Sequence, residues 1–349
     1  MKFGVKLPNS GPFARVECLR AVALQAERLG YDSLWVQDHV TRSAADAEHH
    51  FAAGALEAWQ PPIEPNVYEP ISTLAYLAGM TSRIILGTSI IVLPLRNPVL
   101  LAKQAACLDQ FSGGRLILGV GVGGVRYARS ELGAVGALHL MGSRGQVTDE
   151  WINVLRHVWQ EPTCNFEGKF IQVQDAEVFP KPVQRPCPPI WIGGFGERAI
   201  QRAARRGDGW LPMYFLPSEI ERGVQRLRHW AVEAGRDPYR LQVASEHWLS
   251  IDADKTRAER RAAATLKSLS TYLSASESQG TEQESVLASR LHEAERNLVG
   301  DPDTVLAQLG RYREAGVDHL ILRVIAHDFA EMLDALRLFK REVMDRAVA

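Results

Sequence analysis

One joint recurs along the chain and restricts its fold more than any other feature: a helical segment, a glycine, and then a short apolar strand. An apolar helical period over residues 15–29 leads to Gly30 and to the strand 33–36. Comparable joints lead into apolar segments at 210–213 and 319–322. Because these strands are apolar throughout rather than alternating, they predict a parallel sheet that is covered by helices. The apolar face of the first helix consists of Leu19, Val22, Ala23, Ala26 and Leu29.

Eight segments of this kind can be counted, and eight parallel βα units favour a closed (β/α)8 TIM barrel over a doubly wound sheet. We expect a single α/β domain over 1–349, with insertions in βα connections near 43–69, 161–188 and 252–299. The second insertion should contain a hairpin from Asn165 to Val173. The predicted strands lie near residues 3–8, 33–38, 84–92, 115–122, 189–194, 209–213, 241–250 and 319–324.

Charge and cysteine usage argue against several classes of function. The formal net charge is -1 and the Lys and Arg residues are spread along the chain, so we expect no nucleic-acid partner. The four cysteines are isolated, which is typical of a reducing compartment and predicts no metal site. No apolar run has the length of a membrane span, and the first residues do not resemble a signal peptide. We therefore expect a cytoplasmic protein without a membrane partner.

The pair Asp38-His39 ends the very apolar strand that contains Leu34-Trp35-Val36. In a barrel, polar residues at the carboxyl ends of strands are candidates for function. Histidine can move a proton near neutral pH, and an adjacent carboxylate can help to position it. The alternative is a surface pair that caps the next element.

Two glycine-rich segments also follow predicted strands. Residues 119–124 formally contain GxGxxG, but no helix with an acid at the dinucleotide spacing follows. We interpret these glycines as room for a flat group close to the backbone, with a bend at a barrel corner as the alternative. The segment 192–196 opens a predicted helix over 197–206, which would suit a phosphate. A tight βα turn is the alternative there.

Two further strands carry polar residues. Thr88 and Ser89 lie on the third strand, before an apolar run. On the seventh strand, Glu246-His247-Trp248 could line a substrate pocket, but we favour a buried histidine that is satisfied by the adjacent carboxylate.

Together these segments resemble the bacterial luciferase-like superfamily of flavin- and deazaflavin-dependent oxidoreductases, over nearly the whole chain. The resemblance rests on LGYDSLWVQDH at 29–39, LGTSI at 86–90, FSGGRLILGVGVG at 111–123, PIWIGG at 189–194, GDGW at 207–210, GDPD at 300–303 and AGVDH at 315–319. So many motifs in the same order are specific for the superfamily.

Asp38-His39 and the turn 121–123 resemble the branch that uses coenzyme F420. This resemblance implies that His39 donates or accepts a proton, and that the Ser89-Ile90 peptide is cis behind the deazaflavin ring. The sugar-phosphate dehydrogenases of the branch have an acid directly after the glycines of the fourth strand, where this chain has Gly124. They also have a lysine after the sixth strand, and the corresponding stretch of this chain, 213–216, is apolar. A phosphorylated sugar is therefore not the expected substrate. The cofactor-binding residues that we expect are Asp38, His39, Thr88, Ser89, Ile90, Gly121, Val122, Gly123, Gly193, Gly194 and Phe195.

The expected function is hydride transfer between coenzyme F420 and a small organic substrate, with His39 as the catalytic residue. The alternative cofactor is FMN, in a luciferase-like monooxygenase. A flavin-binding protein without catalysis is a further alternative, since no second acid is evident. A metal-dependent hydrolase would need His-x-His at the end of an early strand, which the chain lacks. We expect a homodimer.

Overall fold

The computed structural model describes residues 1–41, 66–274 and 294–348. Within these residues, eight parallel strands form a closed ring, in the order β1, β2, β3, β5, β8, β9, β10 and β12. Pairing of β9 with β10 and of β12 with β1 closes the ring, so the predicted TIM barrel is confirmed. The ring strands are β1 Lys2–Lys6, β2 Ser33–Val36, β3 Ile85–Thr88, β5 Leu116–Gly121, β8 Ile190–Gly193, β9 Gly209–Leu211, β10 Gln242–Ile251 and β12 His319–Val324.

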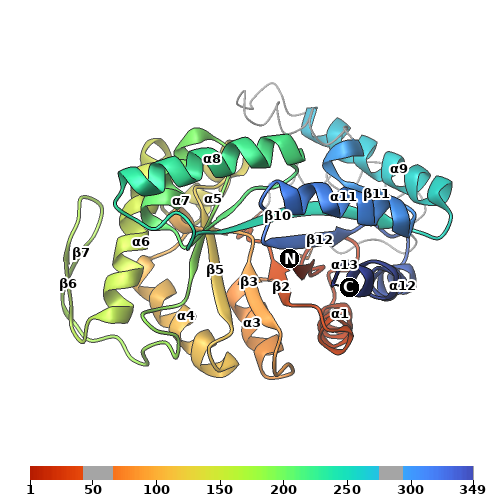
Figure 1. Ribbon diagram of the computed structural model, residues 1–349. Helices are drawn as coiled ribbons and strands as arrows, with labels where there is room; N and C mark the ends of the chain where they lie inside the picture. Colours follow the sequence, from red (N-terminus) through yellow and green to blue (C-terminus); the bar gives the residue numbers. More distant parts are fainter. Residues whose placement is uncertain (42–65, 275–293, 349) are drawn as a thin grey trace.

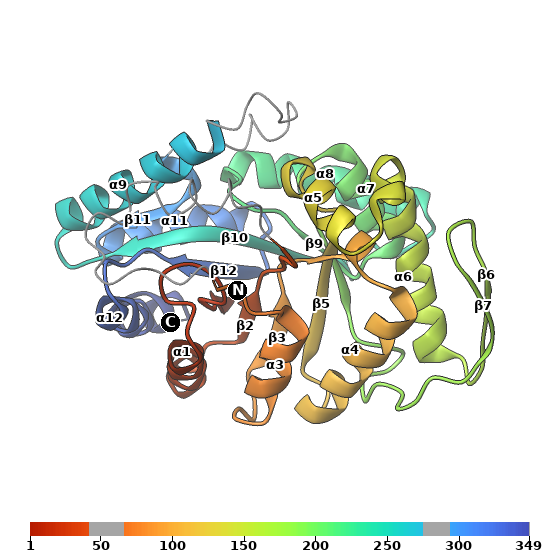
Figure 2. The same cartoon turned by 180° about the vertical axis from the view of Figure 1, so that it is seen from behind.

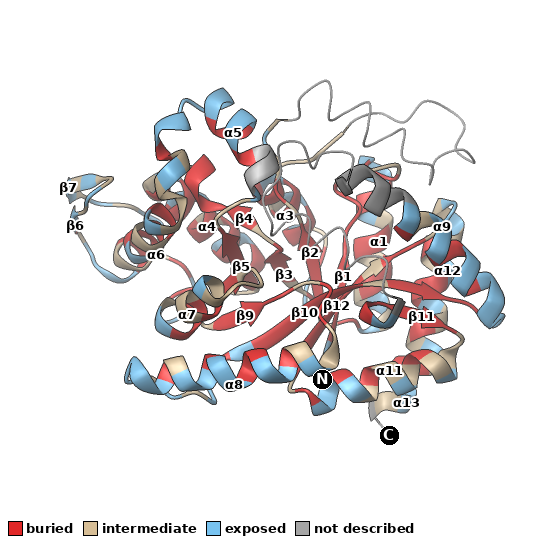
Figure 3. Ribbon diagram, turned by 90° about the horizontal axis from the view of Figure 1, so that it is seen from above, coloured by how far each residue is buried: buried red, intermediate tan, exposed pale blue. Residues whose placement is uncertain are grey.

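Helices surround the ring (Figure 1), and their exposed faces point outward (Figure 3). The first of them, α1, shows why the recurrent joint works: its apolar face is buried, and Gly30 ends it in the left-handed region at φ 80°. The helices are α1 Val16–Leu29, α3 Pro70–Ala78, α4 Pro98–Ser112, α5 Val125–Ala134, α6 Arg144–Gln160, α7 Glu197–Arg206, α8 Pro217–Glu233, α9 Lys255–Ser274, α11 Pro302–Glu314, α12 Phe329–Phe339 and α13 Asp345–Val348. Among the described helices, none is long and apolar enough to cross a membrane.

Two tryptophans fill the middle of the barrel. The rings of Trp35 and Trp191 stack with their centroids 5.4 Å apart. Glycines on neighbouring strands leave the space for them, because a Cβ at Gly87 would collide with the Trp35 ring and a Cβ at Gly209 would lie 2.7 Å from Trp191. Ile117, Leu211, Ala244 and Ile321 complete this apolar layer. We call it the lower layer, because on β10 and β12 it lies nearer the amino ends of the strands than Glu246 and Arg323.

The predicted hairpin in the second insertion is confirmed, as the antiparallel strands β6 Cys164–Glu167 and β7 Gln172–Ala176. It stands away from the ring beside α6 (Figures 1 and 2). Glu150 on α6 holds its turn by accepting hydrogen bonds from the N–H groups of residues 169–171.

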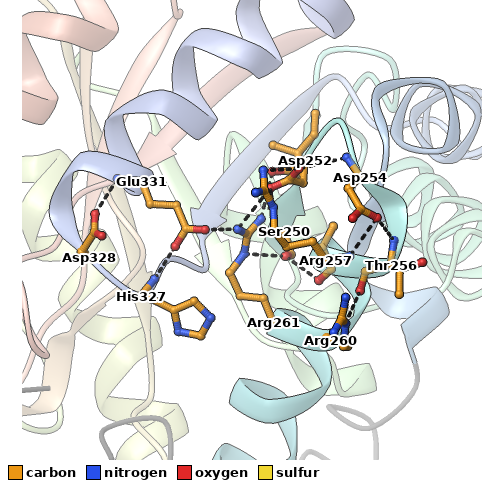
Figure 4. A network of polar contacts seen from close by, with 12 residues as sticks. Ser250, Asp252, Asp254, Thr256, Arg257, Arg260, Arg261, His327, Asp328 and Glu331 are labelled. Carbon is orange, nitrogen blue, oxygen red and sulfur yellow. Dashed lines mark hydrogen bonds and ion pairs between the residues drawn. The ribbon is translucent and has the colours of Figure 1, made fainter. Parts of the chain in front are cut away.

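The insertion over 252–299 is helical at its start, as predicted, because it contains α9. It also adds a short strand that the sequence did not predict, β11 Leu298–Gly300, which pairs with the end of β10. A buried arginine, Arg261, fastens α9 to the barrel (Figure 4): its guanidinium bonds Glu331 on α12 and the Ile251 carbonyl. Residues 275–293 of this insertion lie outside the described residues, as do 43–65 of the predicted 43–69 loop.

Candidate active site

Asp38 lies two residues beyond the end of β2 and is buried rather than exposed at the barrel mouth. Its carboxylate accepts hydrogen bonds from the Val92 N–H at 2.9 Å and from the Arg96 guanidinium at 2.8 Å. Burial raises the pKa of Asp38, and the bonds from Arg96 and Val92 act in the opposite direction. Asp38 therefore ties the end of β2 to the segment after β3.

His39 is the more accessible member of the pair, with a quarter of its side chain exposed. Its Nδ1 lies 3.3 Å from Oε1 of Glu131, a buried residue of α5. The same oxygen accepts the Val40 N–H at 2.8 Å. The fold thus brings a carboxylate to the histidine that the sequence places after β2.

Glu131 is not among the residues predicted from the sequence, because the acid implied by the resemblance falls at position 124, seven residues earlier. A signal was nevertheless present in the sequence. Glu131 falls on the same helical face as Ala128 and Leu132, which are buried. An acid on a buried apolar face needs a partner, so this pattern marks a polar contact.

The third strand is interrupted by a bulge. β3 ends at Thr88, the Ser89-Ile90 peptide is cis as predicted, and the chain resumes as β4 Ile91–Val92. Thr88 Oγ1 donates to the Gly119 carbonyl at 2.8 Å. Lys6 on β1 donates to both the carbonyl and the hydroxyl of Ser89, at 2.7 and 2.6 Å. The neighbouring strand β5 and, across the barrel interior, Lys6 of β1 therefore hold the bulge.

The glycines of β5 and β8 accommodate this bulge. A Cβ at Gly121 would lie 2.7 Å from Ile90 Cδ1, and one at Gly193 would lie 2.5 Å from Ile90 Cγ2. A Cβ at Gly123 would lie 2.8 Å from Val92. The space beside these glycines, which we interpreted as room for a flat group, is thus filled by the side chains of Ile90 and Val92. Contact of Gly121, Val122 and Gly123 with a cofactor stays a prediction.

At the end of β8, Gly193 and Gly194 lead into α7, whose bounds 197–206 are those predicted. Gly194 has φ +126°, a conformation that L side chains rarely adopt. Its carbonyl accepts the Trp210 indole N–H at 2.9 Å, which holds the turn. Phe195 is half-buried against Phe215. The only acid in the first turn of α7, Glu197, bonds Trp230 and Arg226 on α8.

A charged layer lies above the tryptophans. Glu246 on β10 is almost fully buried, and its Oε2 accepts from Lys6 at 3.1 Å and from Ser89 Oγ at 3.0 Å. Burial lowers the pKa of Lys6 to about 8, although Glu246 opposes this shift. Arg323 on β12 lies 3.8 Å from the other oxygen of Glu246.

The prediction for His247 was right about burial but wrong about its partner. His247 bonds the Ser245 hydroxyl at 2.7 Å and the Arg296 carbonyl at 2.6 Å, and not the adjacent Glu246. Successive side chains of a strand point to opposite faces, so Glu246 and Trp248 face the interior while His247 faces the helices. Burial lowers the pKa of His247 to about 4, which keeps the imidazole neutral.

The barrel mouth thus combines a partly exposed histidine, the bulge around Ile90, a glycine turn before a helix, and a buried charged layer. Within the described residues, no cluster of three or more His, Cys, Asp or Glu could hold a metal ion. Such an arrangement suits proton transfer and the binding of an anionic organic cofactor.

Comparisons with known proteins agree with this arrangement. The family of luciferase-like monooxygenases matches residues 1–319. The chain is 31% identical over 316 residues to the F420-dependent glucose-6-phosphate dehydrogenase of Amycolatopsis mediterranei, with 88% of each chain covered. An F420-dependent secondary alcohol dehydrogenase has the same fold, with a TM-score of 0.77, 21% identity and coverage of 100% and 99% of the two chains.

A second structural relative binds a different cofactor. The oxygenating constituent of 3,6-diketocamphane monooxygenase from Pseudomonas putida, in complex with FMN, has a TM-score of 0.71 at 20% identity, with 99% and 98% coverage. At these identities the two solved structures establish the fold alone. The family match and the curated relative go further: the chain belongs to the luciferase-like monooxygenase family.

Proposed function

We propose that this protein is an oxidoreductase that transfers a hydride between coenzyme F420 and a small organic substrate. The observation that carries the proposal is the His39–Glu131 pair at the barrel mouth, beside the Ser89–Ile90 bulge. The sequence relative named for F420 dependence supports this choice of cofactor over FMN. FMN remains the alternative, with support from the fold of the FMN-bound monooxygenase.

The residues present fit such a cofactor. Its anionic phosphate would bind at the Gly193-Gly194 turn, where α7 begins with N–H groups that have no intrahelical acceptor. The first-turn acid, Glu197, does not oppose this binding strongly, because Arg226 neutralises its charge. The ring would lie against Ile90, which is partly exposed. When bound, the deazaflavin supplies the hydride chemistry.

The part that His39 plays follows from its partner. A carboxylate only accepts hydrogen bonds, so Glu131 Oε1 requires the proton of His39 on Nδ1. The other ring nitrogen, Nε2, then carries a lone pair and can accept or return the proton of a substrate hydroxyl. Glu131 positions the ring in this mechanism. It also holds the Val40 N–H, and thereby the backbone after His39.

The remaining expectations are part of the same proposal. The protein would act as a homodimer in the cytoplasm, as a single domain over 1–349, and its substrate would be a small molecule without a sugar phosphate. Gel filtration with light scattering tests the oligomeric state.

A binding titration with F420, FMN and NADPH in parallel tests the cofactor. We expect F420 to bind with micromolar or better affinity, roughly 8 kcal/mol. Tight FMN binding without measurable F420 binding would overturn the proposal in favour of a monooxygenase. A screen of small alcohols, ketones and enones, followed by F420 absorbance, then identifies a substrate.

A further inference from the structure

Arg323 is a guanidinium in the barrel mouth. Among the described residues it hydrogen-bonds the Tyr214 hydroxyl but has no carboxylate within hydrogen-bond distance. It lies on β12 two residues beyond Ile321, which packs in the barrel interior, so its side chain also points inward. About 28% of the side chain is exposed. Its position at the carboxyl end of a barrel strand is where binding residues are found in this fold.

Among the described residues, the neighbouring charges do not balance this guanidinium. Glu246 already accepts hydrogen bonds from Lys6 and Ser89 through Oε2. Arg323 lies 3.8 Å from Oε1, beyond hydrogen-bond distance, and Oε1 itself has no hydrogen-bond partner. Lys6 and Arg323 carry two positive charges against the one negative charge of Glu246. The cluster therefore has an excess positive charge in a largely buried setting, where a charge is costly unless it is paired.

The Arg323 guanidinium lies over an aromatic ring. Arg323 and Trp248 are register partners on adjacent strands, and the guanidinium carbon lies 4.4 Å from the Trp248 ring centroid. Tyr214 stacks on Trp248 with an angle of 4° between the ring planes, and it is buried. A guanidinium is planar and carries its N–H groups at its edge, in the fork that matches a carboxylate.

We propose that Arg323 binds a carboxylate of the substrate, so that this enzyme acts on small organic acids that carry a second, reducible or oxidisable group. This inference rests on the proposed function, because it takes the barrel mouth as the substrate site. The excess charge of the cluster selects an anion, and the planar fork selects a carboxylate over a neutral carbonyl. The Trp248 and Tyr214 rings would pack on the apolar part of the same acid.

The test uses a panel of probes that differ only in charge. Crotonate, levulinate and benzoate are titrated calorimetrically into the F420-loaded protein, each beside its neutral primary amide. We expect at least one carboxylate to bind roughly tenfold or more tightly than its amide. Arg323→Gln should weaken that carboxylate by about 10- to 100-fold, the range of a charge-assisted hydrogen bond, and leave the amide unchanged. Arg323→Lys should lose less, because it keeps the charge without the fork.

A matched arginine controls for general effects of charge. Arg156 has a similarly exposed side chain, at 25%, and pairs with Asp208 at the opposite end of the barrel. Arg156→Gln should leave carboxylate binding unchanged. If Arg323→Gln does not fold, as judged by circular dichroism, the comparison of Arg323→Lys with the unaltered protein decides the question.

Three results would overturn the inference. The panel could show no preference for any acid over its amide, or Arg323→Gln could retain the preference. Arg323→Gln could also weaken F420 and leave the acids unaffected, which would assign the guanidinium to the cofactor. Failure of the proposed function is a separate result: the protein would then bind FMN and not F420, and the same panel titrated into the FMN-loaded protein would still test Arg323.

Discussion

The lower and upper halves of the barrel interior are both buried, but they satisfy their polar groups in different ways. In the lower half, the Trp35 indole donates to Ser33 Oγ at 2.6 Å, and Ser33 lies 2.6 Å from Nε2 of His319. Burial lowers the pKa of His319 to about 3, so this chain of hydrogen bonds is neutral. In the upper half, Lys6 and Glu246 form an ion pair.

This difference separates stability from function. Among the described residues, no fully buried side-chain N or O atom of Ser33, Trp35 or His319 lacks a hydrogen-bond partner, and the Trp35 and Trp191 rings pack against His319. The upper layer retains the unbonded Oε1 of Glu246 and the partly exposed Arg323. A barrel end with incompletely satisfied charges is expected where a ligand completes them, whereas the opposite end serves stability.

The largest expected effect is a loss of turnover, which we expect for a change at the barrel mouth and not for a change in the lower half. His39→Ala should lower turnover by roughly 10²–10⁴-fold, the usual contribution of a general acid or base. Its melting temperature should change little, because a quarter of the His39 side chain is exposed and Glu131 keeps its hydrogen bond from the Val40 N–H. His319→Gln is the matched change in the lower half, and it should lose stability and keep turnover per folded molecule. Near-normal turnover in folded His39→Ala would remove His39 from the mechanism.

The next largest effect is a loss of stability when the ion pair of the upper half is broken. Lys6→Met should destabilise the protein by about 3–5 kcal/mol, because it leaves the Glu246 carboxylate buried without its partner. The double variant Lys6→Met with Glu246→Gln should recover part of this loss. Urea denaturation of both variants measures the effect. Equal stability of the single and double variants would show that Arg323 alone compensates the charge of Glu246 when Lys6 is removed.

The pH dependence of stability should reveal the neutral, buried histidine of the lower half. The pKa of His319 in the folded state, about 3, lies below the unfolded value near 6.5. Between these values the unfolded chain binds more protons, so the free energy of unfolding falls as the pH falls from about 6.5 towards 3. The slope is at most about 1.4 kcal/mol per pH unit for this one group. His247 adds to the same acid limb.

Denaturation curves at several pH values between 7 and 4.5 measure this slope. In His319→Gln the slope should be shallower, because one titrating group is removed while His247 remains. An unchanged slope in this variant would show that folding does not lower the pKa of His319.

The smallest effect tests packing in the lower half. Gly87→Ala should cost roughly 1–3 kcal/mol, because its Cβ would collide with the Trp35 ring. Gly310→Ala in α11 is the matched control: nothing lies within 4 Å of its Cβ, so it should stabilise by about 0.5–1 kcal/mol. Thermal unfolding compares the two. If Gly87→Ala were neutral, the tryptophan layer would be less tightly packed than the structure indicates.

Local patterns in the sequence were enough to predict much of the fold. The eight ring strands, the hairpin and the bounds of α7 all follow from apolar periodicity and from glycine, which act within a few residues. The cis peptide at Ser89-Ile90 followed from the resemblance of one short motif. The strand β11 was missed, because its three residues give no periodic signal and pair only at the edge of β10.

The sequence by itself determined that apolar parallel strands alternate with helices, and that Asp38-His39 ends one of them. Only the tertiary structure decided which distant residues meet. Glu131 lies 92 residues from His39, and Lys6 lies 240 residues from Glu246. Closure of the ring places β12 between β1 and β10, and strand register turns Glu246 inward and His247 outward. Side-chain partners depend on ring closure and register, which are set by the packing of the whole core rather than by neighbours in the chain.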